Sequence, residues 1–133
     1  MTPLNVRVSA AFTEADLAAA VRPGVTAIYL PLAESSEQVQ RAEALIRHYE
    51  RERGIRPGSV AIRPLIETPK GVASASDVAA SSQRIHEFGA GPKLFVHLDT
   101  EPGSATVDYA QAECELVARA LDLEPATIEF MGD

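Results

Sequence analysis

The 133-residue sequence has a single cysteine, no tryptophan and few other aromatic residues. Because Cys114 has no second cysteine to pair with, a disulfide framework and a cysteine-rich zinc site are both excluded, as is usual in a reducing compartment. No apolar run approaches the roughly 20 residues that cross a bilayer, and residues 1–5 lack the charged and apolar regions of a signal peptide. These absences predict a cytoplasmic protein without a membrane span.

Positive charge is also scarce. The chain has 12 Lys and Arg residues against 19 Asp and Glu residues, for a formal net charge of −7. Nucleic acids and anionic membrane surfaces bind basic faces, so neither is an expected partner. A local basic pocket for a small anionic molecule remains compatible with this balance. We therefore expect a small-molecule substrate.

Strand and helix patterns alternate along the whole chain. Strands are predicted at residues 5–9, 25–30, 60–67, 93–98 and 126–131, and a glycine-rich loop is predicted at residues 88–92. This alternation indicates an α/β fold with a parallel sheet and right-handed crossovers. The length fits one domain over residues 1–133. About five strands resemble part of a TIM (β/α)8 barrel and are too few to close one.

Capping residues mark the predicted helix starts. Thr13 and Asp16 resemble a capping box, and Ser35 and Ser74 are predicted to cap later helices. The helix after Ser35 is the longest, ending near residue 53. Its charged residues are interpreted as a solvated face: Glu43, Arg47, Glu50, Arg51, Glu52 and Arg53.

Two strand patterns lead into acidic residues, Glu67 and Asp99. Chemistry in β/α barrels is carried out at the carboxyl ends of the strands. If the two strands are neighbours, about 4.8 Å apart, both carboxylates can meet on one ion. Carboxylates combined with water and substrate oxygens suit Mg²⁺. Alternatively, an acid after a strand is only the N-cap of the following helix.

Three further residues are candidates for the same site, the opening (mouth) of the barrel at the carboxyl ends of the strands. Arg7 alternates with valines in its strand, so inside a barrel its guanidinium would grip a carboxylate; alternatively it faces solvent on an edge strand. Glu34 would hydrogen-bond within the mouth or begin the next helix. Lys70 would present positive charge to an anionic ligand or be a solvated turn lysine. His97, within a strand, and Cys114, on an apolar helix stripe, are interpreted as packing residues.

These segments, taken in order, resemble the HpcH/HpaI aldolase and citrate lyase beta-subunit family. V-R-V-S at residues 6–9 resembles the family's V-R-V-N, and I-Y-L-P-L-A-E-S at 28–35 resembles V-L-P-K-V-E-S. R-E-R-G-I-R-P-G-S at 51–59 resembles E-R-G-L-P-P-G-S, and L-I-E-T-P-K-G-V at 65–72 resembles L-I-E-T-A-R-G-V. Shorter likenesses at 80–85 and 109–121 extend the match over most of the chain.

The resemblance implies a β/α barrel that uses Mg²⁺ to cleave or form carbon–carbon bonds. It implies substrates that are 2-oxo acids or acyl-CoA thioesters. It also implies that Glu67 is a metal ligand and that Arg7 contacts a substrate carboxylate. Together with the residues above, we expect Glu67 and Asp99 to bind the metal, Arg7 and Glu34 to be catalytic, and Arg7 and Lys70 to bind substrate.

The sequence also departs from the family pattern. The family's lysine after L-P is Leu32 here, and two arginines of its late helix are replaced by Gln111 and Glu113. The second metal carboxylate, from an F-G-A-E-D segment, is kept as Asp99 only with extra residues after Glu67. Aligning residues 88–92 instead keeps F-G-A and loses the acid; the alignment on Asp99 is preferred because residues 93–98 form the better strand pattern.

Two functions follow as expectations. The first is a Mg²⁺-dependent carbon–carbon lyase of the citrate lyase beta-subunit type. The second is a catalytically inactive descendant that serves as a binding or assembly subunit, consistent with the lost positive charges. An incomplete barrel has open sheet edges, so we expect a homo-oligomer or a complementing chain.

Overall fold

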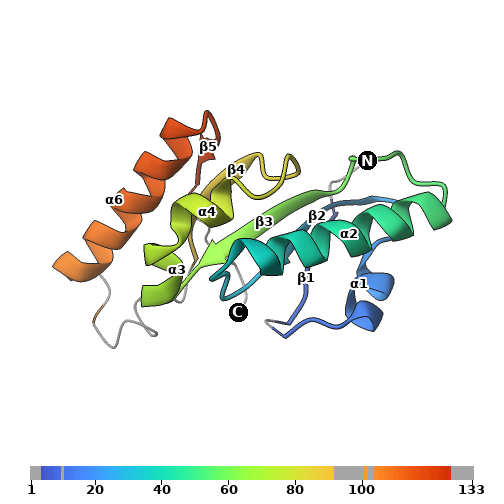
Figure 1. The fold of residues 1–133 in the computed structure, drawn as a ribbon, viewed down its shortest axis with the longest axis horizontal. Helices are drawn as coiled ribbons and strands as arrows, with labels where there is room; N and C mark the ends of the chain where they lie inside the picture. The colour runs from blue at the N-terminus through green and yellow to red at the C-terminus, as the bar shows by residue number, and fades with distance from the viewer. Residues whose placement is uncertain (1–3, 10, 92–100, 102–103, 127–133) are drawn as a thin grey trace.

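The computed structural model describes residues 4–9, 11–91, 101 and 104–126 (Figure 1). Its strands are β1 (Leu4–Arg7), β2 (Val25–Leu30), β3 (Ala61–Ile66), β4 (Glu87–Ala90) and β5 (Glu124–Pro125). Its helices are α1 (Glu14–Ala20), α2 (Ser36–Glu52), α3 (Pro69–Ala73), α4 (Ala75–Ala79) and α6 (Ala105–Ala120). The strands form one sheet in the order β1-β2-β3-β4-β5, and all four pairings are parallel. The predicted α/β class with alternating units is confirmed.

The fourth strand lies where the sequence predicted a loop. Strand β4 is Glu87–Ala90, and it pairs with β3 through Leu65 and Ile66. A Cβ on Gly89 would lie 1.4 Å from the Ala126 carbonyl oxygen, so this glycine permits a close approach of strands and is not a loop signal. The prediction of a loop at residues 88–92 was therefore wrong. The predicted strand at 93–98 lies outside the described residues, as does most of the predicted 126–131 strand.

Of the five helices described, four begin at a polar side chain that caps them; the predicted cap Ser74 precedes α4 but forms no side-chain capping hydrogen bond. Thr13 and Asp16 form the predicted capping box, and the Ser35 hydroxyl accepts the Gln38 N–H. Helix α3 was not separately predicted: Thr68 caps it, accepting the Gly71 N–H, with Pro69 at its first turn. Among the helices described, none is both long and apolar enough to cross a bilayer.

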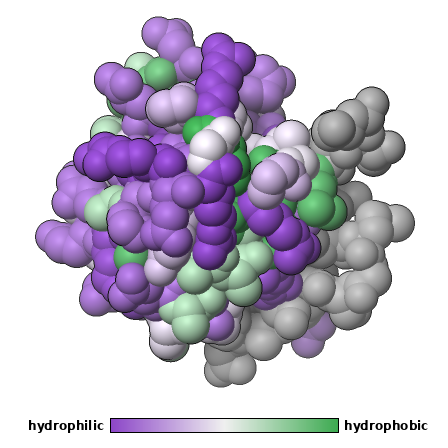
Figure 2. Space-filling model, turned by 90° about the vertical axis from the view of Figure 1, so that its right-hand side faces the viewer, coloured by the Kyte–Doolittle hydropathy of each residue, from purple (hydrophilic) through white to green (hydrophobic). Residues whose placement is uncertain are grey.

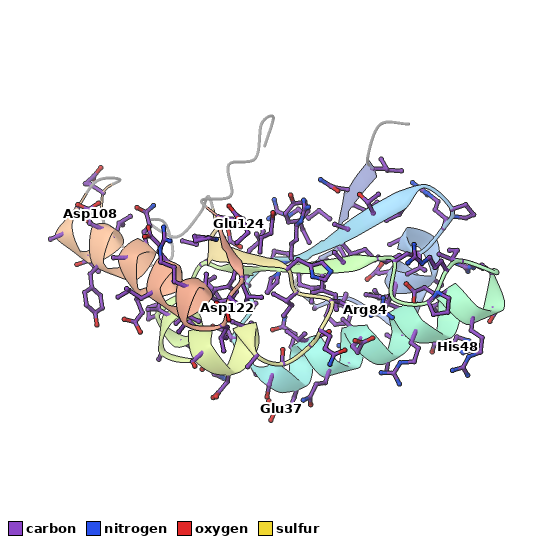
Figure 3. All side chains as sticks on the ribbon, turned by 90° about the horizontal axis from the view of Figure 1, so that it is seen from above. Glu37, His48, Arg84, Asp108, Asp122 and Glu124 are labelled. Atoms are coloured by element: carbon purple, nitrogen blue, oxygen red, sulfur yellow. The ribbon has the colours of Figure 1, made fainter. Side chains whose placement is uncertain are left out.

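The sheet has two chemically different faces. Ile62 and Ile66 of β3 belong to a core built with α2, α4 and α6, which lie along one side of the strands in Figure 3. The alternate residues of β3, Ala61, Arg63 and Leu65, point to the opposite face, because side chains alternate along a strand. We call this opposite face the inner face of the sheet.

A buried ion network joins α2 to the amino-terminal end of the sheet. Glu50 is 1% exposed, and its two carboxylate oxygens accept hydrogen bonds from Arg84 at 2.7 and 2.8 Å. Arg84 also donates to Glu43 and to the Val60 carbonyl oxygen, and it lies between the strands and α2 in Figure 3. The interpretation of Glu43 and Glu50 as solvated was wrong.

That interpretation failed because Glu50 lies on the buried side of α2, one turn after Ile46 and beside Tyr49. The other charges of this helix are exposed as predicted: Arg47, Arg51, Glu52 and, at its end, Arg53. Figure 2 views the end of the molecule where α2 terminates and shows a mostly hydrophilic surface. Spacing alone does not distinguish a charge with a buried partner from a solvated one.

We expect Arg84→Met to lower the free energy of unfolding by about 3–5 kcal/mol, because it leaves a buried carboxylate without its cation. Urea denaturation at pH 7 would measure this loss. Arg47→Met is a matched control, since Arg47 also approaches Glu43, at 3.8 Å, but is 59% exposed. The control should cost less than about 1 kcal/mol. Equal effects of the two substitutions would contradict a structural role for the network.

The same network predicts acid sensitivity. Burial alone would raise the pKa of Glu50, but hydrogen bonds from Arg84 and from the backbone N–H groups of Gly58 and Val60 outweigh it and lower that pKa. Ionised Glu50 therefore stabilises the fold above the ordinary glutamate pKa of about 4.3, and this stabilisation is lost as the pH falls through the lower folded-state value. Urea denaturation between pH 7 and pH 3 should show a smaller acid loss in Glu50→Gln than in the unmodified chain. An identical pH profile in both proteins would refute this assignment.

Candidate functional site

The carboxyl ends of three neighbouring strands meet at one edge of the sheet. Residues 31–34 follow β2, Glu67 directly follows β3, and Gly91 directly follows β4. The Ala33 N–H donates to the Leu65 carbonyl oxygen at 3.0 Å, and the Gly91 N–H donates to the Ile66 carbonyl oxygen at 2.9 Å. These backbone hydrogen bonds continue the sheet beyond its strands and hold the three segments together. This edge is the candidate site.

Glu67 is the buried acid of the site. Its side chain is 1% exposed, and its Oε1 accepts the Leu32 N–H at 3.1 Å. On the neighbouring segment, a Cβ on Gly91 would lie 2.5 Å from Glu67 Cγ. Glycine at position 91 therefore gives Glu67 the space that it occupies. The alternative interpretation of Glu67 as a helix cap was wrong, because Thr68 is the N-cap of α3.

Glu34 lies beside the start of α3. The Thr68 hydroxyl donates to Glu34 Oε2 at 2.7 Å and accepts the Gly71 N–H at 2.9 Å. Helix α2 is capped by Ser35, so Glu34 precedes that helix and does not begin it. One hydroxyl thus links the loop after β2 to the first turn of α3, next to Glu67.

Arg7 lies on the inner face, at a different level from Glu67. Its neighbour Val8 is buried in the helix-side core, so Arg7 points to the opposite face. Arg7 is in register with Tyr29, and Tyr29 with Arg63. Arg63 precedes Glu67 by four residues, roughly 13 Å of strand. The structure therefore places Arg7 and Glu67 on the same sheet but does not bring them into direct contact.

The strands next to β1 also carry polar residues in register with Arg7. Arg63 donates from Nη1 to the Tyr29 hydroxyl at 3.0 Å, and its Nε forms a salt bridge with Glu87 Oε1 at 3.1 Å. Arg63 and Glu87 are half-buried, with side-chain exposures of 26% and 28%. The sequence pattern did not identify Arg63 or Glu87, because single charges within short strands resemble ordinary surface positions. We call Tyr29, Arg63 and Glu87 the polar row.

The remaining candidates are less central. Lys70 is exposed on α3. Asp99 and His97 lie outside the described residues; the strand beside β3 is β4, so the alignment that keeps F-G-A at residues 88–90 agrees with the structure. The preference for residues 93–98 as the strand beside Glu67 was wrong. Cys114 is buried, as predicted, and burial raises the pKa of its thiol to about 12, so it packs as a neutral side chain.

The donor set of the described residues matches a hard cation. Within them, no group of three or more His, Cys, Asp or Glu side chains is arranged to hold a metal ion. Mg²⁺, however, is commonly bound by one or two carboxylates, with water and substrate oxygens completing its shell. The Glu67 carboxylate provides oxygen atoms only, which suit Mg²⁺ and not thiophilic metals.

The HpcH/HpaI aldolase/citrate lyase family model matches residues 4–128. The chain belongs to this family. Citrate lyase subunit beta of Escherichia coli K12 is 31% identical over 106 residues, which cover 79% of this chain and 35% of that protein. Citrate lyase subunit beta of Haemophilus influenzae is 29% identical over 106 residues, covering 79% and 36%. The resemblance inferred from the motifs is confirmed, and the chain spans about a third of the length of these relatives.

Solved structures share the fold of this chain. RipC from Yersinia pestis has a TM-score of 0.74 at 15% identity, covering 92% of this chain and 56% of that one. A citrate lyase beta subunit from M. tuberculosis, complexed with oxaloacetate and magnesium, has a TM-score of 0.65 at 21% identity, covering 91% and 52%. At these identities the likeness concerns the fold alone. The expected likeness to part of a TIM barrel is confirmed.

We expect Gly91→Ala to displace the Glu67 side chain, because the added methyl would overlap buried atoms that have little room to move. The free energy of unfolding should fall by about 1–3 kcal/mol. Thermal and urea denaturation would measure this change. Gly58→Ala provides a comparison: no atom lies within 4 Å of its added Cβ, although its φ of +79° adds backbone strain. A Gly91→Ala protein as stable as the unmodified chain would show that Glu67 is not confined by Gly91.

Proposed function

We propose that this chain carries the metal- and substrate-binding end of a Mg²⁺-dependent carbon–carbon lyase of the citrate lyase beta-subunit type. The proposed substrate is a 2-oxo acid or an acyl-CoA thioester. The observation that carries the proposal is the buried Glu67 carboxylate at the carboxyl end of β3, within the L-I-E-T-P-K-G segment. The Leu32 N–H, from the neighbouring loop, donates to this carboxylate. Membership in the family supports the reaction class, and the sequence departures leave the substrate open.

Each candidate residue has a proposed task. Glu67, together with Asp99, would hold Mg²⁺, which supplies Lewis-acid polarisation of a substrate carbonyl. Arg7 binds a substrate carboxylate through its planar guanidinium, which suits a bidentate contact. Glu34 holds the Thr68 hydroxyl and so fixes the loop at the mouth. Lys70, exposed on α3, attracts an anionic substrate.

A second candidate function is a binding or assembly subunit without catalysis. Three substitutions relative to the family pattern favour it: Leu32 for lysine, and Gln111 and Glu113 for arginines. In either function we propose a homo-oligomer or a complementing chain, because β1 and β5 are the outer strands of the described sheet.

Calorimetric titration of Mg²⁺, with and without oxaloacetate, tests the metal site. We expect Mg²⁺ binding that oxaloacetate strengthens and that Glu67→Ala weakens by at least about tenfold, since even outer-shell partners of a metal ligand are worth roughly 10–100-fold. Glu115→Ala, which removes an exposed carboxylate on α6, should bind as the unmodified chain does.

The outcomes separate the two functions. Oxaloacetate-dependent binding that is lost in Glu67→Ala supports the lyase, and assays on candidate thioesters should follow. Binding unaffected by Glu67→Ala would overturn the assignment of Glu67. No Mg²⁺ binding with or without oxaloacetate would exclude the metal-dependent activity for this chain and favour the binding subunit.

A further inference from the structure

Leu32 has an unusual backbone conformation at the mouth of the site. Its φ is +53°, in the left-handed region that side chains other than glycine rarely adopt. Such a residue costs on the order of one or more kcal/mol and persists only where its surroundings fix it. Pro31 precedes Leu32 and Ala33 follows it, so the local sequence has no glycine that would relieve the strain. Interactions that this conformation makes possible must therefore offset the strain.

The conformation lets two successive N–H groups reach the same neighbouring strand. The Leu32 N–H donates to Glu67 Oε1 at 3.1 Å, and the Ala33 N–H donates to the Leu65 carbonyl oxygen at 3.0 Å. In a regular extended strand, successive N–H groups point to opposite sides. An extended Leu32 would therefore keep only one of these two hydrogen bonds. The left-handed turn redirects one peptide toward the carboxylate.

The rest of the surroundings leaves Glu67 little freedom. Gly91 lies against its Cγ and Cδ, at distances that leave no room for a Cβ. A Cβ on Gly71 would lie 2.6 Å from the Ala33 carbonyl oxygen, so α3 packs directly on the loop that contains Leu32. The loop is thus held between β3 and α3, which explains why the left-handed conformation persists.

We propose that Leu32 is a positioning residue, and that its backbone, not its side chain, fixes the orientation in which Glu67 presents its carboxylate to a divalent cation. The cation-binding part rests on the proposed function. The contact with Glu67 is made by the Leu32 N–H, so the leucine side chain is not what the role requires. The strained peptide is what the role requires.

Two substitutions at position 32 separate backbone from side chain. Leu32→Gly removes the side chain but adopts positive φ without strain. Leu32→Val keeps most of the apolar volume, but a β-branched residue strongly resists positive φ. In Mg²⁺ titrations with oxaloacetate, Leu32→Gly should bind as the unmodified chain does. Leu32→Val should bind roughly tenfold more weakly, because a hydrogen bond to a charged group is lost.

A side-chain role predicts the opposite order, since glycine removes more packing than valine. Weaker binding by Leu32→Gly than by Leu32→Val would therefore overturn the proposal. Circular dichroism of both variants would verify that they fold.

Amide hydrogen exchange in the metal-free protein provides a measurement that does not depend on Mg²⁺. Glu67→Met fills a similar volume without an acceptor, so exchange of the Leu32 amide should accelerate at least about tenfold. The Ala33 amide, bonded to the Leu65 backbone, is the internal control and should keep its rate. Equal changes at both amides, or none at Leu32, would overturn the proposal. If the unmodified chain binds no Mg²⁺ while the exchange result holds, only the proposed function fails.

Discussion

The fold depends on hydrogen-bonding two buried carboxylates, those of Glu50 and Glu67, so that their burial does not destabilise it. Glu50 and Glu67 are each 1% exposed, and burying an ionised group is costly unless it is paired or hydrogen-bonded. They lie at opposite ends of β3. Glu50 accepts hydrogen bonds from Arg84 and from the N–H groups of Gly58 and Val60, just before the strand begins. Glu67 accepts the Leu32 N–H just after the strand ends.

The two buried carboxylates have different roles at the two ends of the sheet. In β/α barrels the amino-terminal ends of the strands contribute stability and the carboxyl-terminal ends carry the chemistry. The Glu50 network uses both charge and hydrogen bonds within the protein, so it is suited to holding α2 on the sheet. Glu67, at the other end, is oriented by a backbone peptide, which provides direction without adding a positive charge. Substitutions at Glu67 can therefore be studied with the Glu50 network intact.

Local patterns predicted local structure well. The capping box at Thr13 and the Ser35 cap depend on neighbouring residues only, and both are present. The position of Glu67 at the end of a strand was also predicted correctly, because an apolar strand that ends in an acid and a turn is a local signal; its role as a metal ligand stays a prediction. Glu50 was misinterpreted, since its partner Arg84 lies 34 residues away and no helical pattern reveals it. Strand β4 was mistaken for a loop because a glycine required by close strand packing has the same appearance as a turn glycine.

The residues of the site that the sequence analysis did not identify were missed for one physical reason. Leu32 acts through a peptide N–H, and Gly91 acts by lacking a side chain, so neither has a chemical group that a sequence pattern could identify. The role of Asp99 stays a prediction, and the strand expected to carry it beside Glu67 is replaced there by β4. Shape and backbone direction, which follow only from the assembled sheet, account for what sequence reasoning could not find.

The inner face of the sheet is more polar than is usual for a parallel sheet. Strands of parallel sheets are usually buried on both faces and nearly continuous in apolar residues. Here the polar row of Tyr29, Arg63 and Glu87 crosses that face, and the side chains of Arg63 and Glu87 keep about a quarter of their surface in solvent. A face that served only to pack against another element would gain more from apolar residues, because a partly exposed ion pair contributes little stability. The charged residues retained in register with Arg7 therefore suit this face to polar contacts and not to apolar packing.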